Sequence, residues 1–373
     1  MVLFDESVKE RIEDFYDREQ ELEMFVKGVR EGRRIIAVLG VRRLGKSSLV
    51  KVGLNVLGAP NIFIDVRKAY EEYGSISKIA VYTVFQEGLR KLISRSKWRS
   101  LIEKLKTLRG VKVAVLDVGV EVSLDWSSRG VRLVSILDRV DEWAGEMGER
   151  AVLVLDEAQY LRYSNINFRG LLAYFYDNLR NTVLVLTGSE VGLLLDFLRI
   201  NDPASELYGR YIYEVRLGRF TREESVNFLR KGFAEYGINP PENVIKEAVE
   251  AFDGIVGWLV KFGRLCVDKG VSRERIEETF VEASKLVEEE LGKLFARSVR
   301  YRYILEAVAN GQARWSQIKK YVIARELKPI SDKVLFELLQ NLQKMGLVEK
   351  RMNDEGKLEY YIPDPVIKYI IAK

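Results

Sequence analysis

The segment GVRRLGKSSL at residues 40–49 combines the residue types that bind phosphate. Gly40 and Gly45 are followed at once by Lys46 and Ser47, which is the G-x-x-x-x-G-K-[ST] spacing of a phosphate-binding loop. In such loops the glycines let backbone N–H groups converge on phosphate oxygens, the lysine reaches the β- and γ-phosphates, and the hydroxyl holds Mg²⁺. Lys46 is therefore also expected to take part in catalysis. The residues expected to contact the phosphates are Gly40, Val41, Arg42, Arg43, Leu44, Gly45, Lys46, Ser47 and Ser48.

Two adjacent carboxylates follow the apolar run AVLVL at residues 151–155. Asp156 is predicted to hold Mg²⁺ together with Ser47, and Glu157 to orient or deprotonate the attacking water. An Asp-Glu pair after a strand is by itself a common helix N-cap, but beside a phosphate loop it predicts nucleotide hydrolysis. The chain has no histidine, so general-base chemistry has to rest on a carboxylate, a lysine, a hydroxyl or a bound ion.

Two further groups are candidates for sensing or stabilising the terminal phosphate. The apolar run 181–186 is followed by Thr187 and Ser189, and one of these hydroxyls is expected beside the γ-phosphate. We assign Ser189, although the spacing alone does not choose between the two, and a simple strand-end turn is the alternative. Arg210 precedes the last apolar run and is predicted to act as an arginine finger on a neighbouring subunit's nucleotide. An ordinary salt bridge or a sheet-edge position is the alternative for Arg210.

These groups need strands whose carboxyl ends meet at one edge. Continuous apolar runs separated by helical patterns predict a parallel, wound α/β sheet. The strands are expected at residues 33–39, 61–66, 151–159, 181–189 and 211–217. Residues 111–124 alternate strictly between apolar and other residues, which favours a half-exposed hairpin or edge strand without an assigned function.

The C-terminal part of the chain changes character after residue 217. Helical patterns prevail up to residue 294, opening with a capping box formed by Thr221 and Glu224. Residues 295–373 are read as three helices and a hairpin, the plan of a winged helix. We therefore expect an ATPase core at residues 1–217, a helical lid at 218–294 and a winged helix at 295–373.

Composition restricts the remaining possibilities. The single cysteine, Cys266, excludes a disulfide framework and a Cys-rich metal site. The N-terminal residues resemble no signal peptide, and there is no uncharged apolar stretch of about 18 residues, so we expect a cytoplasmic protein without a membrane segment. The net charge of +5 is too small to indicate nucleic-acid binding, but residues 301–373 carry thirteen Lys and Arg against nine Asp and Glu.

Together these motifs resemble the archaeal ATPase family within the AAA+ class of P-loop ATPases, near the signalling NTPases and the Orc/Cdc6-like initiators. The resemblance rests on FYDREQEL (15–22), GVRRLGKSSL, LDEAQ, LTGSE, LYGR and GIVGWL (254–259). It implies an α/β P-loop core with a helical lid and a winged helix, ATP or ADP rather than a guanine nucleotide, and Mg²⁺. It also implies that Tyr16 and Arg18 lie near the adenine. Val41 and Val256 stand where this family has proline, and Ser47 replaces threonine.

The resemblance leaves two functions open. In the first, an Mg²⁺-dependent ATPase couples its nucleotide state to double-stranded DNA through residues 331–357. In the alternative, a STAND-like signalling or scaffold ATPase switches protein partners without nucleic acid; a third hypothesis, a small-molecule kinase, is disfavoured by LDEAQ and the winged helix. The third helix is expected to bury Leu335, Leu338, Leu339, Leu342 and Met345 and to present Lys333, Glu337, Gln340 and Lys344 outward. The wing adds Lys350, Arg351 and Lys357, with acids interleaved.

Partners beyond ATP follow only partly from these residues. A homo-oligomer is expected if Arg210 acts in trans, and a monomer that assembles on a protein partner is the alternative. Arg42 and Arg43 are expected to pair with acids of the lid or to face solvent.

Overall fold

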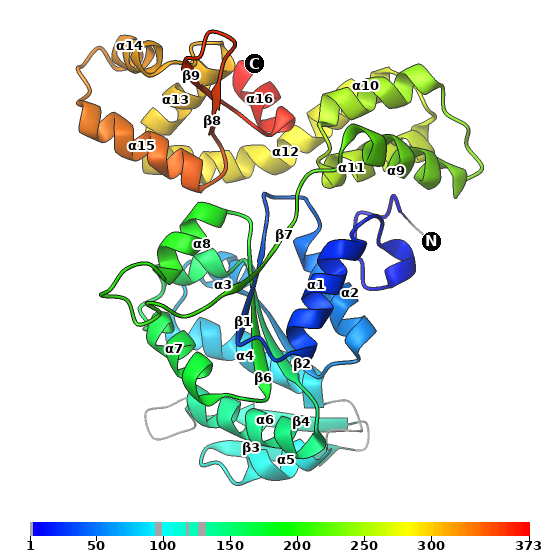
Figure 1. Ribbon diagram of the computed structural model, residues 1–373, viewed down its shortest axis with the longest axis vertical. Coiled ribbons are helices and arrows are strands. Elements are labelled where there is room, and N and C mark those ends of the chain that lie inside the picture. Colours follow the sequence, from blue (N-terminus) through cyan, green and yellow to red (C-terminus); the bar gives the residue numbers. More distant parts are fainter. Residues whose placement is uncertain (1–2, 94–98, 117–118, 126–131) are drawn as a thin grey trace.

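A five-stranded parallel sheet lies at the centre of the N-terminal half in the computed structural model, which describes all residues except 1–2, 94–98, 117–118 and 126–131 (Figure 1). The strand order is β2-β5-β6-β1-β7, and every neighbouring pair is parallel. The strands are β1 (Ile35–Leu39), β2 (Asn61–Asp65), β5 (Ala151–Asp156), β6 (Thr182–Gly188) and β7 (Tyr213–Arg216). All five predicted strands are thus confirmed.

Both faces of this sheet are covered, which explains why its central strands are apolar without alternation. On one face Val38 and Val154 join a core cluster with helices α1 (Glu19–Arg30) and α2 (Lys46–Leu57). On the other face Ala37 and Leu153 belong to a second cluster. The helices on that side are α3 (Val66–Tyr73), α4 (Lys78–Ile93), α6 (Leu133–Met147), α7 (Phe168–Asn178) and α8 (Val191–Leu198).

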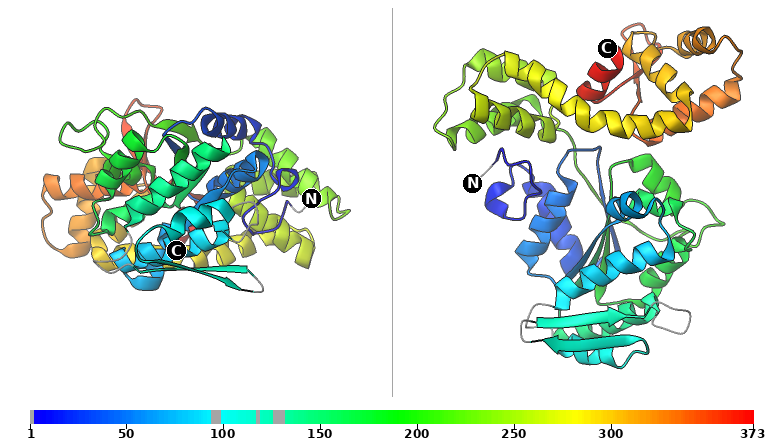
Figure 2. Two further views of the ribbon diagram at one scale, coloured as in Figure 1. Left: turned by 90° about the horizontal axis from the view of Figure 1, so that it is seen from below. Right: turned by 180° about the vertical axis from the view of Figure 1, so that it is seen from behind.

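A small layer extends the second cluster at the end of the core away from the C-terminal helices (Figures 1 and 2). It contains α5 (Arg99–Lys106) and an antiparallel hairpin of β3 (Val111–Leu116) and β4 (Gly119–Leu124). Of the hairpin and the edge strand expected from alternation, the structure has the antiparallel pair of a hairpin. Residues 117–118 lie outside the described residues. Two short 3₁₀ helices complete the described part of the core. Helix η1 (Ile12–Asp14) precedes α1, and η3 (Ala158–Tyr163) follows β5.

The helical part that follows β7 is the predicted lid. The predicted range 218–294 contains α9 (Arg222–Ala234), α10 (Glu242–Phe252), α11 (Val256–Lys269) and the greater part of the helix that begins at Glu274. The capping box of α9 is present, with Thr221 Oγ1 accepting from the N–H of Glu224 and the Glu224 carboxylate accepting from the N–H of Thr221. Helix α12 (Glu274–Arg297) then runs across the carboxyl edge of the sheet to the C-terminal part, and so it crosses residue 294 without a break (Figure 1).

The last part has the helices and hairpin of a winged helix. Its elements are α13 (Val299–Ala309), α14 (Trp315–Glu326), α15 (Asp332–Lys344), β8 (Glu349–Met352), β9 (Leu358–Tyr361) and α16 (Pro365–Ala372). Helix α15 begins after its predicted N-cap Ser331, and Gly346 follows its end in the left-handed conformation. Helix α16 was not predicted from the sequence; it packs on α12 through Tyr369 stacked on Phe280.

Helix α15 differs in two respects from the sequence-based expectation. Its buried residues are Leu335, Leu339 and Leu342, whereas Leu338 and Met345 are only half-buried. The prediction that Lys344 points outward is wrong, because its ammonium group pairs with Asp196 of α8 at 2.5 Å. The C-terminal end of α15 therefore rests on the ATPase core, and only its N-terminal half faces solvent. No helix among the described residues is long and apolar enough to span a membrane.

Candidate functional site

The phosphate loop joins β1 to α2, as its sequence spacing predicts. Gly45 has φ of 90° immediately before α2, a left-handed conformation that favours glycine. Helix α2 therefore begins directly after the loop, and a helix N-terminus that follows a glycine loop is a favourable site for phosphate. Lys46 is buried there and donates from Nζ to the carbonyl of Val41 at 2.8 Å. Burial lowers the pKa of Lys46 below its ordinary value.

Oxygen ligands suited to Mg²⁺ meet beside this loop. Ser47 Oγ donates to the two carboxylate oxygens of Asp156 at 2.9 and 3.2 Å. The hydroxyl of Thr187 also donates to Asp156. Burial raises the pKa of the Asp156 carboxyl, and these two hydroxyl donors act against that rise. A hydroxyl and a carboxylate in contact are a suitable oxygen pair for a hard divalent cation.

Glu157 is held firmly beside the proposed metal ligands. Its backbone is left-handed, with φ of 54°, and its N–H donates to Thr187 Oγ1 at 2.9 Å. Its Oε2 accepts from Ser189 Oγ and from Gln159 Nε2, both at 2.6 Å, and from the Ser189 N–H at 3.3 Å. Burial acts to raise the pKa of Glu157, but the charge of Lys46 and these hydrogen bonds outweigh it and lower the pKa.

The strand order explains which hydroxyl serves which carboxylate. Strand β6 lies between β1 and β5, so that its C-terminal hydroxyls stand between the phosphate loop and the carboxylates. Thr187 contacts Asp156, whereas Ser189 contacts Glu157. The two candidates for a phosphate sensor thus donate to different carboxylates, a distinction that the sequence alone did not provide.

A cavity of about 320 Å³ extends from the phosphate loop towards the lid. Phe15, Tyr16 and Phe220 provide aromatic rings on its wall, and Val256 of α11 adds an aliphatic side chain. This lining suits a flat purine ring. Arg18 also lines the cavity, but its guanidinium lies 4.6 Å from the Phe220 ring centre and donates to the Gly218 carbonyl at 2.7 Å, so it braces the cavity wall.

Two parts of this cavity were not predicted. Residues 3–9 form one wall, anchored by the fully buried Phe4 in the lid and by the N–H of Lys9, which donates to Ser48 Oγ at 3.0 Å. Lys261 of α11 lines the same cavity, with Glu6 and Glu282 as its carboxylate partners at 3.4 and 3.3 Å. A lysine on an amphipathic lid helix carries no sequence signal that separates it from a solvent-exposed lysine.

This geometry agrees with the comparisons with known proteins. Residues 15–262 match the family described as an ATPase domain predominantly from Archaea. The chain belongs to this archaeal ATPase family. A Walker-type ATPase of Pyrococcus abyssi is 37% identical, with a TM-score of 0.82 and 100% of each chain covered.

Other matches concern the fold of this archaeal ATPase. Residues 296–361 match the C-terminal winged helix-turn-helix domain of MCM proteins. The Orc2 protein of Aeropyrum pernix, solved in ADPNP and ADP complexes, is 15% identical and has a TM-score of 0.60, with 99% and 97% of the two chains covered. That likeness shows a common fold. No curated protein gives a significant match.

Both consecutive arginines of the phosphate loop pair with groups outside it. Arg42 forms ion pairs with Glu190, at 3.3 Å, and with Glu290 of α12. The Arg43 guanidinium lies 4.0 Å from the ring centre of Trp258, and burial lowers its pKa to about 10. The expected pairing with an acid of the lid is present for Arg42, because Glu290 lies within the range 218–294 predicted as the lid. Arg43 instead contacts an aromatic ring.

Arg210 is engaged within its own chain in this archaeal ATPase. Its guanidinium makes two hydrogen bonds to the Asp177 carboxylate of α7, at 2.6 and 3.1 Å. The salt bridge weighed as an alternative is therefore present, and the action of Arg210 on a neighbouring subunit stays a prediction.

Proposed function

We propose that this chain binds Mg²⁺ and ATP at the phosphate loop and hydrolyses the terminal phosphate. The observation that carries the proposal is the meeting of three groups at one edge of the sheet: Lys46, the Ser47–Asp156 pair and the hydrogen-bonded Glu157. Family membership supports ATP hydrolysis in general. The aromatic cavity next to the loop supports a purine nucleotide.

Each side chain has a distinct task in this proposal. Lys46 contacts the β- and γ-phosphates, and Ser47 and Asp156 hold Mg²⁺, which neutralises charge on the phosphates when bound. Glu157 orients the attacking water and accepts its proton, and its lowered pKa keeps it ionised at neutral pH. Ser189 fixes the Glu157 carboxylate from the neighbouring strand.

The test is phosphate release from Mg²⁺ and ATP together with equilibrium ATP binding. Lys46→Ala is expected to abolish tight ATP binding and turnover. Lys51→Ala is the matched control, because Lys51 lies on the same helix and pairs with Glu10 at 2.8 Å outside the loop. Unchanged ATP affinity in Lys46→Ala would overturn the assignment of the phosphate site.

We further propose that the nucleotide state is coupled to double-stranded DNA through the winged helix. Residues 296–361 match a winged helix-turn-helix family, and the exposed Lys333, Lys350 and Arg351 have no carboxylate partner among the described residues. Lysine and arginine at such positions contact DNA phosphates. We place the core at 1–217, the lid at 218–294 and the winged helix at 295–373.

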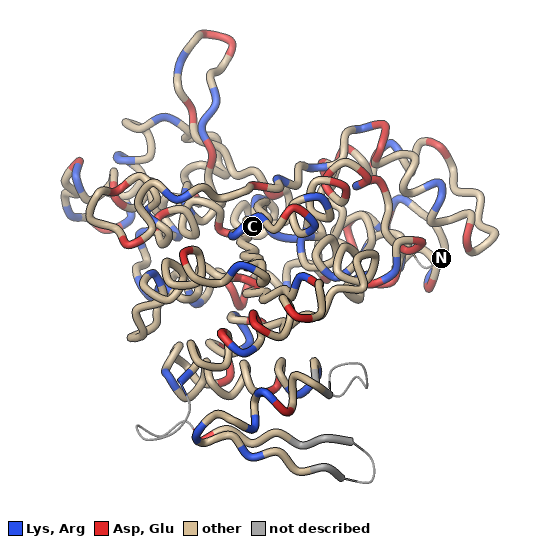
Figure 3. Tube along the Cα trace, turned by 60° about the horizontal axis from the view of Figure 1, so that its bottom comes forward, with Lys and Arg blue, Asp and Glu red and all other residues tan. Residues whose placement is uncertain are grey.

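Three observations favour the alternative, a switch that binds a protein partner. In the described part of the chain, Lys and Arg are interspersed with Asp and Glu along the backbone in the view of Figure 3. Several winged-helix cations are neutralised within the domain, including Arg300 by Glu326 and Lys319 by Asp332. Phe336 of α15 is 49% exposed, and an exposed aromatic side chain is typical of a helix that binds a protein partner.

Duplex binding at two salt concentrations separates these functions. Lys350→Ala and Arg351→Ala are each expected to weaken DNA binding and to reduce the slope of log affinity against log salt by about one. Arg222→Ala, which removes an exposed lid cation paired with Glu250, serves as the control. Duplex binding that is absent, or equal in all three variants, would favour the protein-gated switch.

A further inference from the structure

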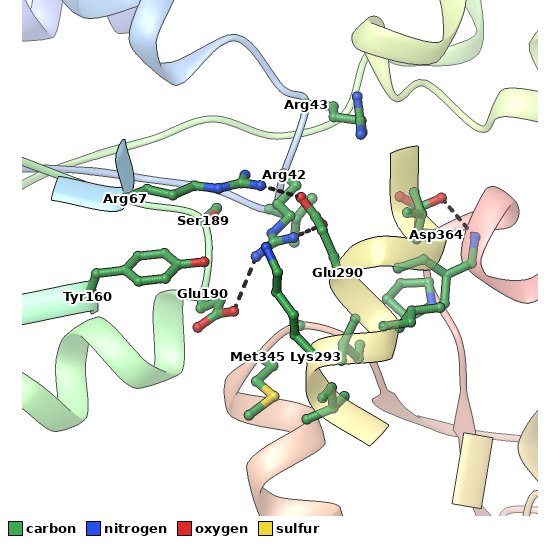
Figure 4. Close-up of a pocket in the computed structure, with 18 of the residues that line it drawn as sticks. Arg42, Arg43, Arg67, Tyr160, Ser189, Glu190, Glu290, Lys293, Met345 and Asp364 are labelled. Atoms are coloured by element: carbon green, nitrogen blue, oxygen red, sulfur yellow. Dashed lines mark hydrogen bonds and ion pairs between the residues drawn. The ribbon is translucent and has the colours of Figure 1, made fainter. Parts of the chain in front are cut away.

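A set of ion pairs connects the phosphate loop to helix α12. Arg42 of the loop reaches Glu290 on α12 and Glu190 directly after Ser189, and the three side chains converge (Figure 4). Arg67 at the start of α3 donates to the other carboxylate oxygen of Glu290 at 2.8 Å. We call Arg42, Arg67, Glu190 and Glu290 the α12 latch.

The latch holds the helix that carries both C-terminal parts. Helix α12 packs against the lid helix α11 and against α13 and α16 of the winged helix. Outside the latch, α12 contacts the core through Lys293, which pairs with Glu71 at 3.9 Å, and through Arg297, which donates to the Tyr163 hydroxyl at 2.9 Å. The winged helix itself contacts the core through Lys344 and Asp196. A change at Glu290 therefore acts on the position of the winged helix relative to the core.

Arg42 is also close to the catalytic groups. Its partner Glu190 directly follows Ser189, whose hydroxyl donates to Glu157 Oε2 at 2.6 Å, so Arg42 adjoins the edge of the sheet where the terminal phosphate of ATP is proposed to lie. A cavity of about 350 Å³ adjoins Arg42, Ser189 and Glu290 and leaves room for the arginine to turn. The Arg42 side chain is 29% exposed, and ion pairs at such positions are weak enough for a phosphate to compete with them.

We propose that Arg42 is shared between the nucleotide and the α12 latch, an inference that rests on the proposed ATP site. Glu290 and Glu190 hold Arg42 when no terminal phosphate competes. The γ-phosphate of ATP draws Arg42 away, Glu290 keeps only Arg67, and α12 moves with the winged helix. Hydrolysis and phosphate loss return Arg42 to Glu290 and close the latch.

In this proposal the contact of Arg43 with Trp258 persists while the ion pair of Arg42 with Glu290 breaks and forms again. Arg43 is packed on Trp258, and its carbonyl accepts from the N–H of Gly257 at 3.0 Å. A Cβ on Gly257 would come within 2.8 Å of the Arg43 side chain, so this approach requires glycine. Trp258 in turn donates from Nε1 to Asp364 at the start of α16. This buried connection is the pivot about which α12 moves.

The experiment measures the separation of the winged helix from the core. Cysteines introduced at Tyr208 of the core and Leu327 of the winged helix, 52% and 88% exposed, carry spin labels for pulsed dipolar distance measurement. The single native cysteine, Cys266, is buried and stays unlabelled. The variants are Glu290→Gln, Arg42→Ala and the control Glu288→Gln, which removes an exposed α12 carboxylate with no ion pair among the described residues.

In the parent chain, a non-hydrolysable ATP analogue with Mg²⁺ is expected to shift the separation by more than about 2 Å relative to Mg²⁺ and ADP. Glu290→Gln and Arg42→Ala are expected to show the ATP-like separation already with ADP, and Glu288→Gln to behave as the parent chain does. The same separation in all variants and with both nucleotides would overturn the latch.

Binding of the analogue, measured in parallel, distinguishes the two proposals. If the analogue binds and the separation does not change, the latch is wrong and the ATP site stands. If the parent chain does not bind the analogue, both proposals fail. A separation that changes equally in Glu288→Gln and Glu290→Gln would show that any charge loss on α12 suffices, which also contradicts the latch.

Discussion

Replacing Ser189 by alanine tests how the structure positions the catalytic carboxylate. The Ser189 hydroxyl donates to Glu157 Oε2 at 2.6 Å, and Glu157 is otherwise held by Gln159 at 2.6 Å and by the Ser189 N–H at 3.3 Å. A hydrogen bond to a charged group contributes about 1.5–3 kcal/mol. If this energy is lost in the transition state, kcat falls roughly 10- to 150-fold, since about 1.4 kcal/mol is a factor of ten. Gln159 Nε2 and the Ser189 N–H still hold the Glu157 carboxylate in the variant, so we expect a fall in kcat near the lower end of this range.

The assay is steady-state phosphate release over a range of ATP concentrations and pH values. ATP affinity should stay close to that of the parent chain, because Ser189 does not contact the loop lysine. The hydrogen bond from Ser189 lowers the pKa of Glu157, so its loss should move the acid limb of the pH profile to higher pH. Ser189→Thr keeps the hydroxyl and should restore most of the activity.

A matched control separates catalysis from folding. Ser205 is also a buried core serine, and its hydroxyl donates to the Leu198 carbonyl at 3.3 Å, away from the carboxylates. Ser205→Ala should leave turnover and its pH profile unchanged. Turnover and an acid limb in Ser189→Ala that match those of the parent chain would refute the positioning role of Ser189.

Two further predictions follow from burial. Phe4→Ala should lower the free energy of unfolding, measured by urea titration, by about 3–5 kcal/mol. The reason is that the Phe4 ring is fully buried, with its centre 4.9 Å from the centre of the Phe233 ring. An unchanged urea midpoint would contradict the anchoring of the N-terminal segment by Phe4. Burial raises the pKa of Asp156, so the Mg²⁺ concentration that half-saturates turnover should rise as the pH falls through that pKa. Glu157 is still ionised there, because its pKa is lowered. A half-saturating Mg²⁺ concentration that stays constant down to the pH at which an ordinary aspartate protonates would contradict this order of protonation.

The core and its phosphate site could be predicted because their determinants are local. A buried strand, a glycine loop and a helix N-terminus follow one another within 25 residues, and their spacing alone specifies the phosphate loop. Asp156 and Glu157 follow a strand in the same way. Parallel strands bring such C-terminal residues to one edge, so the site followed once the strands were recognised.

The contacts between distant segments could not be predicted. Arg42 and Glu290 are separated by most of the chain, and no periodic pattern distinguishes Glu290 from the other acids of α12. The pairing of Lys344 with Asp196 could not be predicted for the same reason. A lysine on an amphipathic helix is expected to face solvent unless another element, distant in the sequence, packs over it. Trp258 could not be assigned to core or contact from its type, and it serves as both, being fully buried and covered by Arg43.

The most direct test of the central claim is the fate of ATP bound to Glu157→Gln. This substitution keeps the size of the side chain and one carbonyl oxygen that can accept hydrogen bonds, and it removes the charge and basicity of the carboxylate. The variant is expected to bind ATP with Mg²⁺ as tightly as the parent chain and to retain it unhydrolysed in a single-turnover measurement. Hydrolysis at the rate of the parent chain would show that Glu157 is not the catalytic base and would contradict the mechanism built on it.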